Sequence, residues 1–455
     1  MAAQIYLGLG TNLANRALNL RRAVQGVASF VAIQAVSAVY QTPPWDDTDQ
    51  PHYFNLCLSG TTTLSPQQLL RAVKALEQRL GRRPTYHWGP RLIDIDILLY
   101  DDLVLREEGL ELPHPGVAER PFVLGPLAEL DPELTHPQNK LTVSEMLLAA
   151  DTGNLERLGS LDDLGWQLLT PFLWGDRTYV MGILNVTPDS FSGDGLMKRE
   201  DRVAAAVAQA EQFVAEGADI IDIGGESSRP GSVPISAEQE MERIFPVIQA
   251  VRRAVNVPIS VDSYRAEVAA AALDNGANWL NDIWGLHMDR ALGQLAAERG
   301  CPLILMHNRS QPKDVTQEER LGGRYVGVEY DDLIADIIAE LQESVDLALN
   351  AGVKPEQIII DPGIGFGKTV TQNLQLIREL DQFKALGYPI LLGSSRKSFI
   401  GYTLDLPPEE RLEGTAATIA IGIDRGADII RVHDVQAMSR VARMTDGLVR
   451  ISGRV

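Results

Sequence analysis

The chain has 455 residues, of which 45% are hydrophobic and 22% are charged, and its formal net charge is −20. This length and composition predict a globular protein with more than one domain. The excess of acidic residues argues against broad nucleic-acid binding. Small ligands that carry phosphate remain compatible with this charge, because arginines can cluster locally inside an acidic surface.

The cysteines and the N-terminus give a consistent expectation of compartment. Cys57 and Cys301 are the two cysteines, far apart and each beside apolar residues, so a disulfide framework is not expected. The first strand-like run begins within a few residues of the N-terminus. We expect no signal peptide, no basic transit segment and no membrane-spanning run. The sequence therefore predicts a cytoplasmic enzyme that acts without nucleic acid or membrane partners.

Residues 1–155 have the patterns of one α+β unit. Strands are expected at 4–10, 31–42, 53–63 and 93–100, and helices at 15–27 and 65–80. Ser65 and Pro66 are typical of a helix start, with serine as the cap and proline in the first turn. The order βαββαβ predicts a ferredoxin-like fold.

Two carboxylates, Asp94 and Asp96, fall in the strand predicted at 93–100. Alternate residues of a strand face the same side, so these groups are expected on one face, about 7 Å apart. That spacing suits one or two Mg²⁺ ions bound against phosphate oxygens. An isolated pair of this kind is more often a solvated strand face. Here the neighbouring aromatic residues and the Leu112-Pro113-His114 loop favour a phosphate site, where Arg82, Arg83, Arg91 and Arg120 could neutralise the phosphates.

Motifs throughout this unit resemble those of 6-hydroxymethyl-7,8-dihydropterin pyrophosphokinase. They are Gly8-Leu-Gly-Thr-Asn12, Tyr40-Gln-Thr-Pro-Pro44, Asp49-Gln-Pro-His-Tyr-Phe-Asn55, residues 88–96, Pro113-His114 and Arg120-Pro-Phe122. The resemblance implies that Asp94 and Asp96 bind two Mg²⁺ and act in catalysis with Arg82 and Arg91. It implies an ATP site formed by Glu77, Arg82, Arg91, His114 and Arg120. It also implies a pterin pocket formed by Thr42, Pro43, Trp45, Tyr53, Asn55 and Phe122.

After a short connector, residues 172–455 alternate strand-like runs with helical patterns, which predicts a (β/α)₈ barrel. The runs are 179–185, 219–224, 259–262, 279–283, 303–307, 358–361, 390–393 and 429–433. Most of these strands have a polar residue at or just past their ends: Asn185, Asp222, Asp262, Asn281, His307, Asp361, Lys397 and His433. One such residue is more often a helix cap or a turn former. A set of eight is expected at the C-terminal rim, where such barrels carry their chemistry.

The glycine-rich stretch 361–368 ends in lysine and has some likeness to a phosphate-binding P-loop. It lacks the spacing of four residues between the first glycine and Gly-Lys, and it lacks the helix start that follows a P-loop. We therefore expect its glycines to let the backbone approach a flat ligand beside Asp361.

The barrel half resembles dihydropteroate synthase. The resemblance rests on residues 183–192, 222–231, 260–263, 281–283, 305–307, 361–368, 395–398 and 431–434. It implies that Asp262, Asn281, Asp361 and Lys397 bind the pterin, with Asp262, Lys397, Arg431 and His433 in catalytic roles. It implies a site for p-aminobenzoate and the diphosphate formed by Asn185, Phe191, Ser228, Arg229, Pro230, Phe366, Ser395, Arg431 and His433. Asn185 is also expected to bind Mg²⁺.

The two resemblances share one intermediate, because the first reaction makes the pterin diphosphate that the second consumes. We predict a bifunctional folate-pathway transferase that uses Mg²⁺, ATP, hydroxymethyldihydropterin and p-aminobenzoate; a homodimer through the barrel is left open. One alternative is a pterin-binding methyltransferase that acts with a corrinoid protein, although Lys397, Arg431 and His433 favour a diphosphate leaving group. The other is that the first half is a binding module without catalysis.

Overall fold

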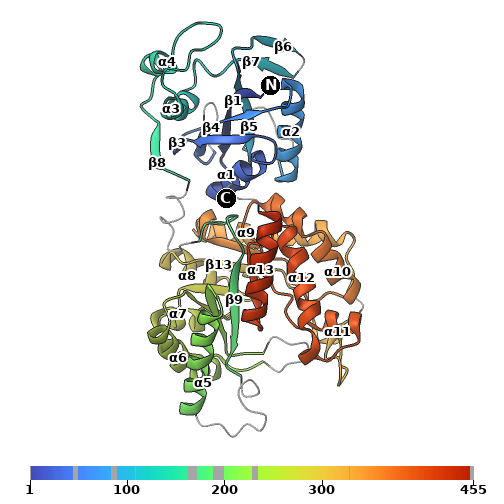
Figure 1. The fold of residues 1–455 in the computed structure, drawn as a ribbon. Helices are drawn as coiled ribbons and strands as arrows, with labels where there is room; N and C mark the ends of the chain where they lie inside the picture. Colours follow the sequence, from blue (N-terminus) through green and yellow to red (C-terminus); the bar gives the residue numbers. More distant parts are fainter. Residues whose placement is uncertain are drawn as a thin grey trace. The chain divides into compact units, whose positions relative to one another are not determined.

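The computed structural model describes residues 2–44, 50–82, 90–107, 109–161, 172–187, 199–227, 234–326 and 328–450. The chain divides into two compact units, of which the first consists mainly of Met1–Asp176 and the second of Arg177–Lys384 and Tyr388–Ile451 (Figure 1). The functional limits 1–155 and 172–455 stay predictions. Among the described helices, none combines the length and the apolar character needed to cross a membrane.

The first unit is built on an antiparallel sheet. Its strands are β1 (Ala3–Thr11), β2 (Ala32–Val36), β3 (Val39–Thr42), β4 (Tyr53–Thr62), β5 (Asp94–Tyr100) and β8 (Glu156–Gly159), and a hairpin of β6 (Leu105–Glu107) and β7 (Leu110–Leu112) lies apart from it. The strand order is β5-β1-β4-β3-β8, and β2 also pairs with β4. The strand predicted at 31–42 is divided into two at Ser37, whose hydroxyl accepts the N–H of Cys57 (3.0 Å).

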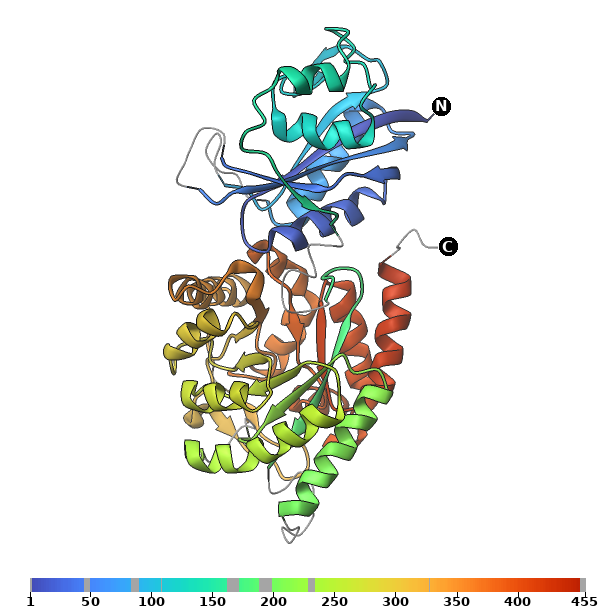
Figure 2. The ribbon, with the colours of Figure 1, turned by 90° about the vertical axis from the view of Figure 1, so that its left-hand side faces the viewer.

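Helices cover both faces of this sheet (Figure 2). α1 (Arg16–Val27) and α2 (Pro66–Arg79) pack on Ile5 and Leu7 of β1, whereas α3 (Pro121–Leu130) and α4 (Val143–Ala149) pack on the side of Tyr6. This alternation follows from the period of two residues in a strand. Ser65 caps α2 as predicted, since its side chain accepts the N–H of Gln68.

The second unit is a barrel of parallel strands. They are β9 (Tyr179–Asn185), β10 (Ile220–Gly224), β11 (Ile259–Asp262), β12 (Trp279–Asp282), β13 (Leu303–Met306), β16 (Ile358–Asp361), β17 (Leu391–Leu392) and β18 (Ile429–Val432). Their order is β16-β13-β12-β11-β10-β9-β18-β17. A parallel bridge between Ile360 and Ile390 brings the two ends of this order together. The barrel brings the C-terminal ends of all eight strands to one rim.

Helices surround the barrel (Figures 1 and 2). They are α5 (Arg199–Ala215), α6 (Ala237–Ala254), α7 (Ala266–Asp274), α8 (Ala291–Arg299), α9 (Leu333–Asn350), α10 (Val370–Arg378), α11 (Ser398–Leu404), α12 (Leu412–Asp424) and α13 (Val435–Val449); a small hairpin of β14 (Val315–Thr316) and β15 (Arg324–Tyr325) precedes α9. Gly217, Gly276 and Gly426 follow helices with positive φ, as expected of C-terminal caps. The predicted antiparallel α+β fold and (β/α)₈ barrel are both confirmed.

Candidate active sites

Asp94 and Asp96 lie on β5 and both line a cavity of the first unit. The Nη1 atom of Arg82 is 2.7 Å from Asp94 Oδ1, and Arg91 pairs with Asp94 Oδ2. Burial and the neighbouring Asp94 carboxylate raise the pKa of Asp96. The strand therefore presents two acids on one face, with two arginines beside them.

Three further residues predicted for ATP lie around this pair. Glu77 is buried, and its Oε1 accepts the N–H of Ile95 (2.8 Å) and lies 2.5 Å from Arg82 Nη1. Nδ1 of His114 accepts the N–H of Gly116 (3.1 Å), which leaves the proton on Nε2, 4.0 Å from Asp96 Oδ1. Arg120 lines the cavity that Asp94 and Asp96 line. Glu77 thus holds Arg82 and β5, whereas His114 and Arg120 are half-buried side chains near the two acids.

The predicted pterin residues Thr42, Pro43, Tyr53, Asn55 and Phe122 line the same cavity. The buried Asn55 side chain donates from Nδ2 to Thr42 Oγ1 (3.0 Å). Its Oδ1 would lie 2.9 Å from a Cβ at residue 10, so Gly10 is needed for this close approach. The cavity therefore combines an oriented amide with aromatic side chains, which suits a flat heterocycle. Trp45 and Arg83 lie outside the described residues.

In the barrel, Arg431 joins two acids from neighbouring strands. Its Nε donates to Asp222 Oδ2 (2.6 Å) and its Nη2 donates to Asp262 Oδ2 (2.7 Å). Asn281 donates from Nδ2 to the same Asp222 oxygen (3.2 Å). Burial raises the pKa of Asp262 to about 7, against the opposing effect of Arg431. These four side chains form one polar floor at the C-terminal ends of β10, β11, β12 and β18.

A second group lies beside this floor and is built on the glycine-rich loop 361–368. Asp361 Oδ1 accepts the N–H of Gly363 (2.7 Å). Nζ of Lys397 donates to the carbonyl of Ile364 and lies 4.4 Å from the centre of the Phe366 ring. Burial lowers the pKa of Lys397 to about 7, and the Asp361 carboxylate opposes this shift. An acid, a base and an aromatic ring therefore lie together, as the sequence predicts.

The remaining described residues predicted for the diphosphate also lie at this rim. Ser395 Oγ accepts the N–H of His433 (3.1 Å) and lies 3.0 Å from His433 Nδ1. The Ser395 hydroxyl can therefore donate a hydrogen bond to Nδ1 of His433. In that arrangement the neutral ring carries its own hydrogen on Nε2. Asn185 is level with Gly224 of β10 in the strand register, and Gly224 is level with Asp262. Phe191, Ser228, Arg229 and Pro230 lie outside the described residues.

Comparisons with known proteins identify the family of each unit. Residues 181–433 match the model of the pterin binding enzyme family, and residues 6–132 match that of 7,8-dihydro-6-hydroxymethylpterin-pyrophosphokinase. A folate synthesis bifunctional protein of Arabidopsis thaliana is 36% identical over 474 residues, which cover 98% of this chain and 96% of that protein. The chain belongs to the bifunctional folate synthesis proteins.

Other relatives cover one or both units. The folic acid synthesis protein of Schizosaccharomyces pombe is 36% identical over 97% of this chain, which spans only 59% of that protein's length. A dihydropteroate synthase structure from Clostridium difficile, determined in the presence of pteroic acid, has a TM-score of 0.56 and 44% identity; the match covers 61% of this chain and 99% of that one. The structure of the Xanthomonas albilineans dihydropteroate synthase with 4-aminobenzoic acid has a TM-score of 0.54 and 37% identity. The match covers 61% of this chain and 95% of that one.

The predicted bifunctional activity is confirmed: the chain carries a pyrophosphokinase unit, whose family uses ATP, and a dihydropteroate synthase unit. The methyltransferase alternative and the binding-module alternative for the first half are therefore wrong. The individual roles of the site residues stay predictions, although the described ones lie at the two sites.

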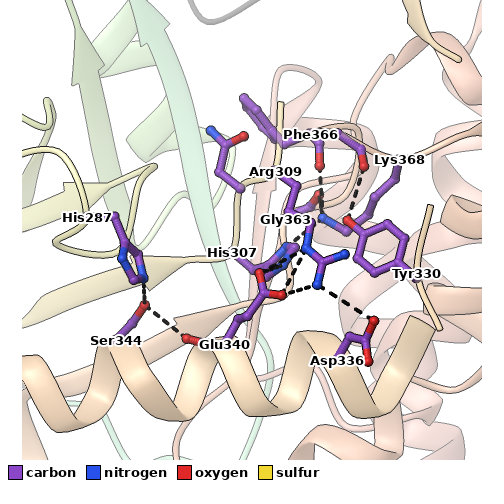
Figure 3. A network of polar contacts seen from close by, with 12 residues as sticks. His287, His307, Arg309, Tyr330, Asp336, Glu340, Ser344, Gly363, Phe366 and Lys368 are labelled. Carbon is purple, nitrogen blue, oxygen red and sulfur yellow. Dashed lines mark hydrogen bonds and ion pairs between the residues drawn. The ribbon is translucent and has the colours of Figure 1, made fainter. Parts of the chain in front are cut away.

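Sequence reasoning names His307 among the polar residues at the rim, but it assigns no binding or catalytic role to four residues that lie beside the loop 361–368. They are His307, Arg309, Glu340 and Lys368, which form a chain of polar contacts (Figure 3). Lys368 enters the prediction only as the last residue of the glycine-rich stretch 361–368, with no role of its own. Glu340 is one of many acids on an amphipathic helix, and its sequence context does not distinguish it from a solvated residue.

Proposed function

We propose that the two units perform consecutive steps with the residue roles given below. In the first, the hydroxymethyl oxygen of the dihydropterin forms a bond to the β-phosphorus of ATP while the bond from that phosphorus to the oxygen of the α-phosphate breaks; AMP leaves with the electron pair, and the hydroxyl group loses its proton. In the second, the amine nitrogen of p-aminobenzoate forms a bond to the pterin methylene carbon while the C–O bond to the diphosphate breaks. The electron pair leaves with pyrophosphate, and the amine loses a proton. The observation that carries the second step is the floor of Arg431, Asp222 and Asp262 beside Lys397.

In the pyrophosphokinase unit, Asp94 and Asp96 would hold Mg²⁺. The donor set fits this ion, which in nucleotide enzymes is bound by one or two carboxylates together with phosphate oxygens. When bound, the ion neutralises charge on the transferring phosphoryl group. Arg82 and Arg91, both beside Asp94, are placed to contact phosphate oxygens, and His114 and Arg120 contribute further positive or hydrogen-bonding groups.

The pterin of the first step would occupy the cavity lined by Thr42, Pro43, Tyr53, Asn55 and Phe122. The Asn55 amide is oriented by Thr42, so it can offer the pterin edge an acceptor at Oδ1 and a second donor hydrogen at Nδ2. The tyrosine and phenylalanine supply apolar faces for the bicyclic ring. Trp45, outside the described residues, is proposed for the same pocket.

In the synthase unit, Asp262, Asn281, Asp361 and Lys397 would bind the pterin. The three side chains with oxygen acceptors suit its N–H groups, and Lys397 suits its carbonyl oxygen. Positive charge builds on the ring as the C–O bond breaks, and the Asp262 carboxylate offsets it. Burial of this acid makes its charge more effective, because the interior screens charge less than water does.

The diphosphate would be bound by Asn185, Ser395, Arg431 and His433, with Mg²⁺ at Asn185. Asp222 and Asp262 hold the guanidinium of Arg431 at this rim, from which it can contact phosphate oxygens. Phe366 would form one wall of the p-aminobenzoate pocket, together with Phe191, Ser228, Arg229 and Pro230, which lie outside the described residues.

The assay that tests this proposal supplies the intact chain with ATP, Mg²⁺, hydroxymethyldihydropterin and p-aminobenzoate. Equal amounts of AMP and dihydropteroate are expected. Omission of ATP should abolish both products, and omission of p-aminobenzoate should leave AMP formation alone. Formation of dihydropteroate without ATP, or of AMP without any dihydropteroate in the complete mixture, would contradict the proposed sequence of steps.

Cytoplasmic placement and association of two chains through the barrel belong to the same proposal. One plant relative at 36% identity is named as mitochondrial, so compartment has to be measured in the source cell by fractionation. The association predicts a particle of twice the chain mass in sedimentation equilibrium. A monomer at every protein concentration tested would remove that part of the proposal.

A further inference from the structure

Lys368 closes the glycine-rich loop 361–368 and is only 2% exposed. We propose that Lys368 is a positioning residue of the synthase site, which holds this loop from its buried side and thereby places Asp361 and Phe366 for the substrates. The inference rests on the proposed function, because Asp361 and Phe366 are assigned to substrate binding there. Within this loop, the hydrogen bonds of the Lys368 side chain go to backbone carbonyls and not to the side chains of Asp361 or Phe366.

The ammonium group of Lys368 has three polar neighbours. Its Nζ lies 2.9 Å from the carbonyl oxygen of Gly363, 2.9 Å from that of Phe366 and 2.9 Å from Nδ1 of His307. Burial lowers the pKa of Lys368 well below its usual value, and the Asp361 carboxylate opposes this shift. In the charged form of the lysine, its three N–H donors match these three acceptors. The two carbonyls belong to either end of the turn 363–366, so one side chain fixes both ends of it.

His307 connects this lysine to helix α9. Burial and the neighbouring Lys368 lower the pKa of His307 to about 4, so the ring is neutral at physiological pH. Nδ1 faces the lysine and acts as acceptor, and Nε2 donates to Glu340 Oε2 (2.9 Å). Arg309 donates from Nε to the other oxygen of Glu340 (2.9 Å). Figure 3 shows these side chains as a network of polar contacts between helix α9 and the loop 361–368.

Glu340, the acid of α9 in this network, is ionised at physiological pH. Against the opposing effect of burial, the hydrogen bonds from His307 and Arg309 lower the pKa of Glu340 to about 2. A charged carboxylate fixes the proton of His307 on Nε2, and this fixes Nδ1 as the acceptor for Lys368. The position of the loop is therefore tied to the rigid end of β13 and to α9.

The loop needs such a restraint because its backbone is unusually permissive. Gly363, Gly365 and Gly367 have φ values of +73°, +80° and +59°. A Cβ at Gly363 would lie 1.8 Å from the carbonyl oxygen of His307, and one at Gly367 would lie 2.5 Å from the carbonyl carbon of Arg309. Glycine allows this close packing, and it also leaves the backbone more alternative conformations than other residues would. Hydrogen bonds must then select the active one.

The opposite side of the same turn faces the substrate site. The N–H of Gly363 orients Asp361, and the carbonyl of Ile364 receives Lys397. Lys368 therefore holds the carbonyls of Gly363, whose N–H orients Asp361, and of Phe366, whose ring is the proposed wall of the p-aminobenzoate pocket. Loss of Lys368 would leave two buried carbonyls without this donor, and the turn would move to recover hydrogen bonds.

The test is Lys368→Met, which keeps an unbranched side chain of similar length and removes the three donors. The matched control is Lys354→Met, an exposed lysine that precedes β16 at the other end of the strand. With pterin diphosphate and p-aminobenzoate supplied, the KM of Lys368→Met for both substrates is expected to rise, and kcat/KM to fall about tenfold to a hundredfold. The control should retain the parental constants.

A purely structural role predicts a different result, in which the melting temperature and the active fraction fall while the KM values of the folded enzyme stay parental. That outcome would overturn the inference. Glu340→Ala, paired with Glu343→Ala on the exposed side of α9, provides a milder variant in case Lys368→Met does not fold. A smaller rise in both KM values is expected for Glu340→Ala, and parental KM values would contradict the inference.

The parental chain separates this inference from the proposed function. If it makes no dihydropteroate from the two supplied substrates, the proposed function fails. If it does, and Lys368→Met and Glu340→Ala both keep its KM values, only the positioning role fails. Pyrophosphokinase activity, measured as AMP formation, should be parental in all of these variants.

Discussion

Asp222 is the residue that best illustrates how a buried charge organises the synthase site. It is 0% exposed, and its Oδ2 accepts from both Arg431 and Asn281. Its Oδ1 has no hydrogen-bond partner among the residues that the structure describes. Such a group is costly to bury unless its charge is paired. Arg431 supplies that charge, so Asp222 keeps the guanidinium pointed at the rim where the diphosphate is proposed to lie.

We predict that Asp222→Asn lowers kcat/KM for pterin diphosphate by about tenfold to a hundredfold. The amide keeps the shape of the acid but removes the charge that orients Arg431. The free energy of unfolding of the barrel should also fall, by about 1–3 kcal/mol, because a buried hydrogen-bond network is left imperfect. Steady-state kinetics and urea unfolding measure the two effects.

Asp219→Asn is the matched control. Asp219 precedes β10 at the opposite end of that strand and lies 2.6 Å from Arg177, so it too is an acid paired with an arginine. A loss of stability without a change in kcat/KM is expected there. An equal kinetic loss in both variants would mean that general destabilisation, rather than the orientation of Arg431, explains the Asp222 result.

The two shifted pKa values at this rim predict a narrow pH optimum for the synthase reaction. Asp262 must be a carboxylate and Lys397 an ammonium to bind the pterin as proposed, and the pKa of each lies at about 7. As pH rises toward 7, Asp262 loses its proton and kcat/KM rises; above 7, Lys397 loses its charge and kcat/KM falls. The charged groups that influence this pair are Arg431, Asp222, Glu240, Asp282 and Asp361.

The measurement is kcat/KM for pterin diphosphate between pH 5 and 9, with about six pH values on the acidic limb of the profile and about six on the alkaline limb. Asp262→Asn should remove the acidic limb at the cost of most activity, and Lys397→Gln should remove the alkaline limb. A parental profile that is flat across this range would show that neither group titrates in the free enzyme.

At the scale of an element, the loop 361–368 determines the shape of the synthase site. Its left-handed glycines bring the backbone against the segment 307–310 on one side and against Lys397 on the other. A Cβ at Gly365 would lie 2.7 Å from Cδ of Lys397. A side chain at this position therefore adds a clash with a substrate-binding residue to the backbone strain.

Gly365→Ala is predicted to displace Lys397 and to lower kcat/KM for pterin diphosphate by about tenfold or more. Gly352→Ala is the control, because Gly352 also has positive φ (+92°) but its Cβ would meet Ala297 at an ordinary 3.5 Å. Both variants should lose about 1–2 kcal/mol of stability from the left-handed conformation. Activity should separate them, and a fully active Gly365→Ala enzyme would contradict this description of the loop.

The elements that sequence reasoning predicted well are those with strong periodicity. The eight barrel strands are short apolar runs that end in polar residues, and the glycines after the helices mark their ends, so strand, helix and rim all follow from local patterns. The pattern of residues 31–42 predicts a single strand and does not reveal the interruption at Ser37, because that interruption depends on a hydrogen bond to Cys57 on β4. The polar line from Glu340 to Lys368 could not be predicted either. Its members come together only when the barrel closes.

At the scale of the whole molecule, the chain combines two chemically related sites. Each unit places carboxylates, arginines and aromatic side chains around a site proposed for the same bicyclic ring. The pyrophosphokinase unit is proposed to need the metal-binding acids of β5, whereas the synthase unit is proposed to need the floor held by Arg431. Because these sets of residues are separate, either step can be removed while the other is kept.

The most direct test of this account is Asp94→Asn, assayed with and without added pterin diphosphate. The substitution removes a proposed Mg²⁺ ligand, so AMP formation from ATP and hydroxymethyldihydropterin should be lost. Asp102→Asn, at an exposed acid just after β5, is the control and should be active in both steps. We predict that Asp94→Asn makes no dihydropteroate from ATP and hydroxymethyldihydropterin, yet makes it at the parental rate once pterin diphosphate is supplied with p-aminobenzoate. Undiminished AMP formation, or no dihydropteroate from the supplied diphosphate, would contradict the account.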